Sequence, residues 1–228
     1  MVRFCQILSL FALMTVYACS NQSPNSPDNE APPTLPDLST LSITLPQNAP
    51  ADIQAMIFAA NSLTGTGYAY LNAVTDTQPT HANGQWVWKY NNGSLTITLT
   101  ATVSADSVHW QLQLDGTETA SNTQFNNWTV MTGASSLDGK NGTLVIYNIN
   151  STQVAGNATW QTDDQDNLTV NLTADVIAVE ASGNQNGSGN MTIQQSGVKI
   201  YEATWTSTGG SWTSYDPATG QQKDSGTW

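Results

Sequence analysis

Positive charge, cysteine and glutamate are scarce in this chain of 228 residues, and each scarcity excludes a class of protein. Five Lys and Arg stand against 17 Asp and Glu, which gives a net charge of -12. The chain therefore cannot form the basic face that nucleic acids require, and we expect no nucleic-acid partner. Only four acidic residues are Glu, too few for the heptads of a coiled coil.

Uncharged polar residues dominate what is present. Thr, Ser, Asn and Gln account for 90 of the 228 residues, whereas charged residues make up only 10%. Hydrophobic residues reach 39%, which is too many for a fully disordered chain. We therefore expect a folded domain whose surface consists mainly of hydroxyl and amide groups.

The N-terminal residues have the pattern of a secretion signal. Arg3 supplies a positive charge, and an apolar stretch follows from Ile7 to Val16. That stretch is shorter than the roughly 20 residues of a membrane-spanning helix. It ends in Val16-Tyr17-Ala18-Cys19, which resembles the lipobox of bacterial lipoproteins, although Tyr17 is larger than the residue usual there. Cleavage by an ordinary signal peptidase after Ala18 is the alternative interpretation.

The resemblance to bacterial lipoproteins implies that Cys19 becomes the first mature residue and carries a diacylglycerol anchor. Because Cys5 leaves with the signal, the mature chain has no second cysteine, and no intrachain disulfide is expected. Two or three acyl chains hold a protein stably on a membrane. Ser20, where Asp would indicate retention in the inner membrane, is typical of outer-membrane lipoproteins. We expect a lipoprotein outside the cytoplasm, on the outer membrane if the bacterium has two membranes.

Composition divides the chain into three segments. Residues 1–18 are the expected signal peptide, residues 19–50 a tether rich in Pro, Ser and Asn, and residues 51–228 a β domain. Seven of the nine prolines lie within residues 20–50, and such a composition favours an extended chain. The alternation of Leu41, Ile43 and Leu45 indicates that the end of the tether packs on the domain.

One helix is expected, over residues 49–63. Its apolar positions recur at helical spacing, at Ile53, Met56, Ile57, Ala60 and Leu63. Asn48 suits an N-cap, and Gly65 and Gly67 are expected to end the helix. We interpret it as a helix packed on a sheet, with a lid or plug over a cavity as the alternative.

From residue 67 onward the periodicity changes to two, which predicts strands. Residues 68–73 read as the first strand. Residues 95–103 alternate apolar side chains with threonines, and residues 108–114 form the next strand, ended by Asp115-Gly116. Residues 168–179 read as one strand with a bulge at Ile177.

About ten to twelve strands linked by short turns predict a mainly β fold, because short turns join antiparallel neighbours. We expect an antiparallel meander that forms a curved sheet, half-barrel or barrel, with one N-terminal helix. A closed barrel is preferred because the helix could fill it, and a two-sheet sandwich is the alternative. This architecture resembles the lipoprotein carrier and receptor family, whose open half-barrels hold acyl chains. The resemblance implies no particular binding residues.

Catalytic and metal-binding patterns are weak. His81 and His109 are the only candidate bases, no Gly-x-Ser-x-Gly elbow is present, and we expect neither an enzyme nor a cofactor. A hydrolase would require Glu202 to meet a second carboxylate in a cleft, and if the Glu202 side chain faced the interior, burial would raise its pKa. Asp163, Asp164 and Asp166 supply oxygen ligands that suit calcium, but Asp is also a common turn residue, so we expect no metal site.

Tryptophans provide the remaining candidate site. Several fall at apolar positions of strands, and we interpret them as core or as the lining of a cavity: Trp86, Trp88, Trp110, Trp160 and Trp205. The expected function is a non-catalytic binding module for an apolar or amphipathic ligand, such as a lipid-like small molecule. The alternative is a surface structural or adhesive protein that contacts glycans or proteins through the threonine ladder Thr96–Thr102.

Overall fold

The computed structural model describes residues 31–35, 41, 51–184 and 186–227. The expected signal peptide, Cys19 and most of the tether lie outside the described residues. Ala31–Trp228 form one compact unit. In chain order its elements are α1 (Ala51–Thr75), β1 (Thr80–Ala82), β2 (Gln85–Asn91), β3 (Leu95–Ser104), β4 (Ser107–Glu118), β5 (Thr123–Ser136), β6 (Asn141–Tyr147), β7 (Val154–Thr162), β8 (Leu168–Ala174), β9 (Ile177–Gly183), β10 (Gly189–Gln195), β11 (Val198–Thr206), β12 (Gly209–Tyr215) and β13 (Gln222–Thr227).

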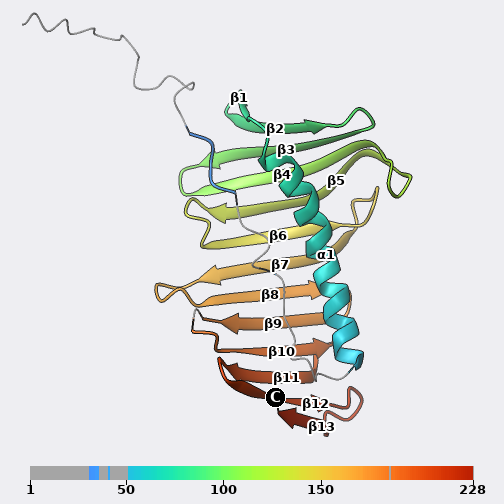
Figure 1. Ribbon diagram of the computed structural model, residues 1–228, viewed down its shortest axis with the longest axis vertical. Coiled ribbons are helices and arrows are strands. Elements are labelled where there is room, and N and C mark those ends of the chain that lie inside the picture. Colours follow the sequence, from blue (N-terminus) through green and yellow to red (C-terminus); the bar gives the residue numbers. More distant parts are fainter. Residues whose placement is uncertain (1–30, 36–40, 42–50, 185, 228) are drawn as a thin grey trace, which may run out of the picture. The chain divides into compact units, whose positions relative to one another are not determined.

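The strands form one curved, antiparallel sheet of 13 members, and each strand pairs with its neighbours in the sequence (Figure 1). The expected antiparallel meander is confirmed. The expected closed barrel is wrong, because the sheet is open, with β1 and β13 at its edges. Both edges resist pairing: β1 has three residues and follows Pro79, and β13 exposes Lys223 and Asp224.

The helix is longer than its sequence pattern predicted. It spans 25 residues, so it runs through Gly65 and Gly67, and residues 68–73 are helical where a strand was expected. The apolar stripe continues through Leu71 and Val74, both buried. Gly67 is used for close packing, because an added Cβ would lie 2.8 Å from Met131 Sδ. Tertiary packing has outweighed the low helix propensity of glycine. The predicted cap Asn48 lies outside the described residues.

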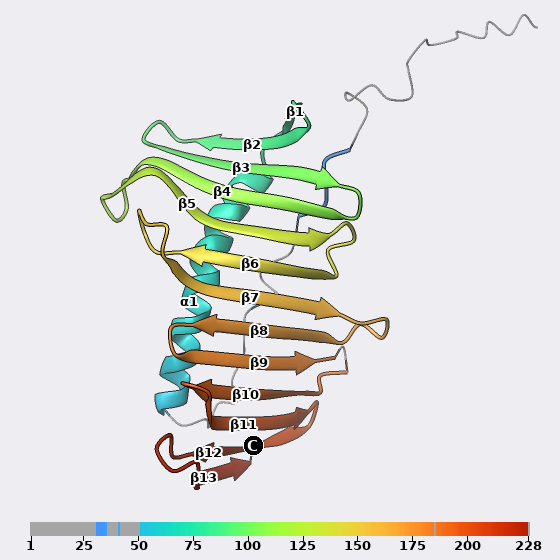
Figure 2. The ribbon, with the colours of Figure 1, turned by 180° about the vertical axis from the view of Figure 1, so that it is seen from behind.

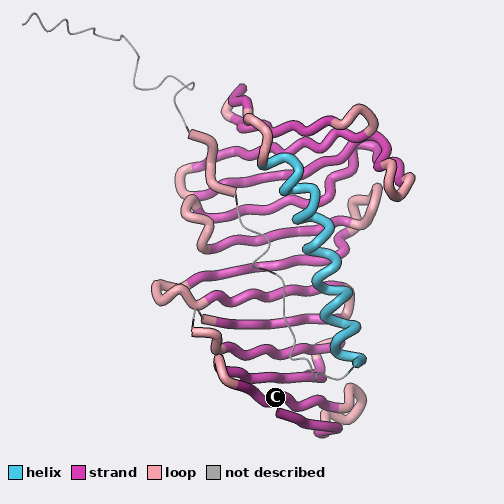
Figure 3. Tube along the Cα trace, in the orientation of Figure 1, coloured by secondary structure: helices cyan, strands magenta, loops and turns pink. Residues whose placement is uncertain are grey.

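Helix α1 crosses one face of the sheet (Figures 1 and 3) and contacts β2, β3, β6 and β8. We call this face the inner face and the opposite one the outer face. Figure 2 shows the outer face from the front, with α1 behind the strands. The strand alternation sets the two faces, since successive side chains of a strand point to opposite sides.

Two strand boundaries differ from those expected. Strand β4 continues through Asp115-Gly116 to Glu118, with a register shift at Gly116. Gly116 has a φ of 107° and lies against the Ser94 carbonyl, which only a glycine permits. Residues 168–179 form two strands, β8 and β9, because Asp175 adopts a φ of 51° and starts a tight turn. The phase change at Ile177 therefore marks a hairpin rather than a bulge.

Large rings on the inner face lie flat on glycines of the neighbouring strand. A Cβ at Gly142, for example, would lie 2.1 Å from the Trp160 ring. The same arrangement occurs in four cross-strand pairs: Trp110 with Gly133, Trp160 with Gly142, Trp205 with Gly189, and Trp212 with Gly226. A ring that lies on the sheet forms a thin apolar layer, and a thin layer lets α1 approach the strands.

Candidate functional site

The inner face gathers the candidate tryptophans. Trp86, Trp88, Trp110 and Trp160 are buried, whereas Trp205 is half-buried at the margin of the core. Trp86 and Trp110 flank Ala101 in one cross-strand row, so the two rings share the space above a small side chain. The strand pattern therefore placed all five residues on the correct face.

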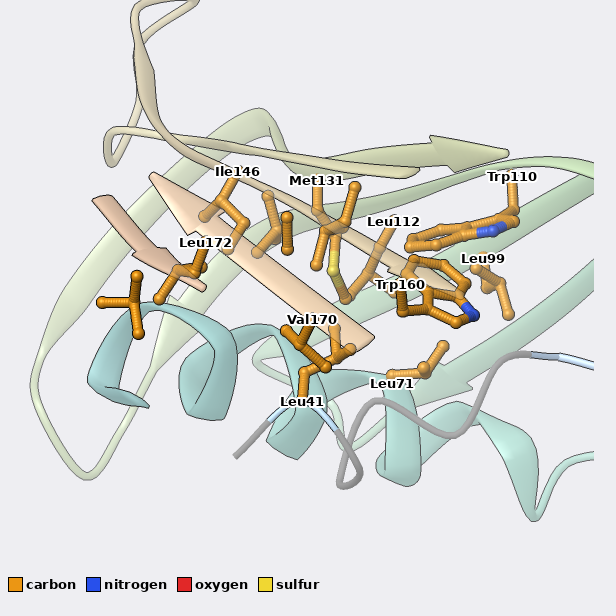
Figure 4. Packing of buried hydrophobic residues seen from close by; sticks show 14 of the residues in the cluster. Leu41, Leu71, Leu99, Trp110, Leu112, Met131, Ile146, Trp160, Val170 and Leu172 are labelled. Carbon is orange, nitrogen blue, oxygen red and sulfur yellow. The ribbon is translucent and has the colours of Figure 1, made fainter. Parts of the chain in front are cut away.

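A layer of aliphatic side chains lies between these rings and α1. Leu71 enters it from the helix and Leu41 from the segment that precedes the helix, and both are at most 3% exposed. Figure 4 shows them meeting Val170, Trp160 and other side chains of the sheet. Since Leu41 lies in this layer, the packed domain reaches further toward the N-terminus than residue 51.

Five polar atoms of the inner face are buried without a hydrogen-bond partner in the described structure: Trp110 Nε1, Trp128 Nε1, Ser135 Oγ, Tyr201 OH and Trp212 Nε1. Such groups are rare in native proteins, because burial removes the water that would otherwise bind them. Trp160 is different, since its Nε1 donates to the Gly139 carbonyl oxygen at 3.0 Å. Sequence reasoning identified only Trp110 among the five, although Tyr201 shares the alternation of Ala203 and Trp205.

A polar contact ties the second half of α1 to the sheet. Tyr70 OH donates to Glu118 Oε1 at 3.0 Å, and Ser121 Oγ donates to Glu118 Oε2 at 2.5 Å. Burial, together with the hydrogen bond and the charge of Glu118, raises the pKa of Tyr70 to about 12. The Tyr70 ring also meets Phe125 edge-on, with centroids 6.3 Å apart. These contacts fix the C-terminal half of the helix over β4 and β5.

The outer face carries an uncharged polar groove. Cross-strand pairing connects one row of small and polar side chains over six strands, namely Thr102, His109, Ala134, Thr143, Thr159 and Asn171. Two shallow hollows of about 390 and 400 Å³ lie along it, and both are lined by Ala134 and Thr143. The groove therefore presents hydroxyl and amide groups to whatever lies on it.

Glu202 does not face the interior. It lies on the outer face, where Lys199 Nζ donates to its Oε2 at 2.7 Å and Tyr215 OH donates to its Oε1. These hydrogen bonds hold the pKa of Glu202 below its usual range. The raised pKa that an interior Glu202 would have does not arise, because strand register points this side chain away from the core.

The histidines occupy separate environments. His81 stacks on Trp86, with ring centroids 4.5 Å apart. His109 Nε2 lies 3.4 Å from Ser107 Oγ on the outer face. The Ser107–His109 contact is longer than the roughly 2.6–3.2 Å typical of a base and the nucleophile that it activates.

The three aspartates after β7 form a turn. Asp163 accepts hydrogen bonds from the Gln165 and Asn167 backbone amides and from Asn167 Nδ2, and these bonds lower its pKa. Asp166 Oδ1 lies 3.9 Å from Lys140 Nζ. Within the described residues, no three His, Cys, Asp or Glu side chains gather closely enough to hold a metal ion.

No model of a known protein family matches the chain, and a search of curated proteins finds no match. In the described part of the chain, no helix is both long and apolar enough to cross a membrane.

Proposed function

We propose that the protein is a lipid-anchored, non-catalytic binding module of the bacterial envelope, and that it holds an apolar or amphipathic ligand at the inner face. The observation that carries the proposal is an open sheet whose apolar face is covered, within the described residues, by α1 and by Leu41. A ligand could reach this face if α1 moved away from the sheet, because the strands do not close around it.

Helix α1 has the properties of a removable cover. Four of its side chains are buried in the core, those of Ile53, Ile57, Leu71 and Val74. Phe58, on the opposite side, is 75% exposed. Gly65 and Gly67 lie near its middle, where glycine weakens a helix by about 1 kcal/mol relative to alanine. The polar tie through Tyr70 lies in the C-terminal half, so opening is expected to begin in the N-terminal half.

The ligand can be tested by native mass spectrometry on residues 20–228, which lack the anchoring Cys19, exported to a periplasm and purified without detergent. This chain contains the whole compact unit Ala31–Trp228, in which the described core lies. A reproducible adduct that is lost on denaturation supports the proposal. A bare mass, together with failure to bind added acyl compounds, would refute it.

The anchor needs a separate test, because the lipobox alone supports it. Cys19→Ala should prevent acylation and release the protein from membrane fractions, whereas Cys5→Ala should leave it membrane-bound. Continued membrane association of the Cys19→Ala protein would contradict the lipoprotein assignment.

A second candidate function follows from the groove of the outer face, an adhesive contact with glycans or proteins. An uncharged groove lined by Thr, Asn and Gln side chains can exchange hydrogen bonds with neutral partners. Binding to a neutral polysaccharide that is lost in Ala134→Arg and kept in Gln194→Arg, on the same face outside the groove, would support it. Equal binding by both variants would exclude the groove.

A further inference from the structure

The inner face over β11 and β12 contains two buried hydrogen-bonding groups without partners. Tyr201 is 0% exposed and Trp212 is 7% exposed, and their rings stack with centroids 6.0 Å apart. Tyr201 OH and Trp212 Nε1 have no hydrogen-bond partner in the described structure. Two unsatisfied polar groups side by side in one core are unfavourable for folding, so they require an explanation.

Both groups can donate a hydrogen bond, and neither has an acceptor in the described structure. An indole N–H can only donate a hydrogen bond, and a phenol can donate one. Burial raises the pKa of Tyr201 to about 12, so its hydroxyl keeps its proton at neutral pH. Trp110 and Trp128 add two more indole donors without partners on the same face. Trp160, whose Nε1 reaches the Gly139 carbonyl oxygen, shows the type of acceptor that satisfies such a donor.

The acceptor must also be uncharged. Within the described residues no Lys or His is buried, so the inner face holds no cationic side chain in its interior. A carboxylate or phosphate placed there would lose its hydration without gaining a counter-charge, which is strongly unfavourable. A carbonyl oxygen of an ester or amide accepts the same hydrogen bonds without that penalty.

We propose that the inner face binds an uncharged acyl ester or amide, whose carbonyl oxygen accepts hydrogen bonds from Tyr201 OH and Trp212 Nε1. The acyl chain then lies along Met191, Ile193 and Ala203, which neighbour the two rings in the sheet. This inference rests on the proposed function and specifies the chemical class of its ligand. Both donors are covered in the structure, so the ligand displaces the side chains that cover them.

Three probes with chains of the same length test the ligand class on the same protein of residues 20–228. Methyl laurate carries a neutral carbonyl, laurate carries a charged carboxylate at neutral pH, and dodecane carries no acceptor. Titrations followed by tryptophan fluorescence should show methyl laurate binding at least about tenfold more tightly than laurate. Native mass spectrometry then confirms the stoichiometry of each complex.

A pair of Tyr→Phe substitutions locates the site. Tyr201→Phe should weaken methyl laurate about five- to tenfold, the range expected for one lost hydrogen bond, and should leave dodecane unchanged. Tyr147→Phe is the matched control, because Tyr147 OH lies 3.2 Å from Thr132 Oγ1, on the outer face. The melting temperature of free Tyr201→Phe should not fall, since the hydroxyl has no partner to lose.

The outcomes separate the inference from the proposed function. If laurate binds as tightly as methyl laurate, or if Tyr201→Phe and wild type bind methyl laurate equally, the ester or amide inference is overturned while an apolar binding function stands. If none of the three probes binds, both the inference and the proposed function are overturned.

Discussion

The two faces of this sheet are built from the same strands, but one face is apolar and buried whereas the other is polar and partly exposed. In β3, Leu95, Ile97 and Leu99 are at most 4% exposed on the inner face, whereas the threonines between them stay partly exposed on the outer face. On the inner face four tryptophan rings lie against glycines of neighbouring strands, whereas the groove of the outer face is lined mainly by hydroxyl and amide side chains. The free energy of unfolding should therefore depend strongly on the volume of side chains on the inner face and only weakly on that of side chains on the outer face.

The largest effect is expected from removing volume on the inner face. Leu112 is 0% exposed, so Leu112→Ala leaves a cavity and should lower the free energy of unfolding by about 2–5 kcal/mol. Thr100→Ala, on the outer face of β3, should change it by no more than about 0.5 kcal/mol. Urea denaturation of both variants measures the difference. Equal losses would mean that the outer face is also packed against another part of the protein.

Adding volume beneath a ring is expected to have the next largest effect. A Cβ at Gly142 would lie 2.1 Å from the Trp160 ring, and the ring cannot turn aside easily. Gly142→Ala should therefore lower the free energy of unfolding by about 1–3 kcal/mol, measured by the same denaturation.

The matched control for this substitution is Gly65→Ala. Gly65 lies on α1, and an added Cβ there meets nothing within 4 Å. Since alanine favours a helix by about 0.5–1 kcal/mol over glycine, this variant should be more stable than the wild type. A loss of stability in Gly65→Ala, or no loss in Gly142→Ala, would contradict the expected difference between a glycine with free space for a Cβ and a glycine whose Cβ position is filled by a ring.

Strand alternation predicted much of this architecture because each strand has one apolar face. Each of residues 95–103 could be assigned to one face of the sheet, and the same alternation assigned the candidate tryptophans to the inner face. The extent of α1 could not be predicted, since Gly67 looks like a helix end until Met131 is known to lie against it. The open edge could not be predicted either, because local alternation carries no information about whether β1 meets β13.

The site was harder to predict than the fold. Glu202 lies in an apolar strand, but a bulge near Ile200 sets its register, and its partners Lys199 and Tyr215 become neighbours only in the folded sheet. The buried donors Tyr201 and Trp212 likewise read as ordinary core residues. Whether a buried polar atom has a partner depends on contacts between strands, which a sequence pattern does not contain.

The tie between α1 and the sheet predicts a loss of stability in alkali. The pKa of Tyr70 is raised from 10.0 to about 12 in the folded protein, so its contribution is present below pH 10.0 and is lost as the pH rises through about 12. Tyr70→Phe should lose about 1 kcal/mol at neutral pH and should show a smaller further loss in alkali than the wild type.

Tyr201 provides the comparison for this prediction. Its pKa is also raised to about 12, but by burial alone, and its hydroxyl has no partner. Tyr201→Phe should therefore remove part of the alkaline loss without any loss at neutral pH. Thermal unfolding of the two variants over a series of pH values tests the pair, and a neutral-pH loss in both would contradict the difference between a partnered and an unpartnered hydroxyl.

The smallest effect is expected at the charged cluster of the outer face. Lys199 and Tyr215 lower the pKa of Glu202 from its ordinary value of 4.5, so the stabilisation is present above pH 4.5 and is lost as the pH falls through the lower, folded value. Exposed ion pairs contribute little because water and salt screen them. Glu202→Gln should therefore leave stability at neutral pH nearly unchanged and should reduce its decline below pH 4.5. A loss at neutral pH as large as that of Leu112→Ala would show that this part of the outer face is not a solvent-exposed surface, and would place a partner or a second packed layer over β11 and β12.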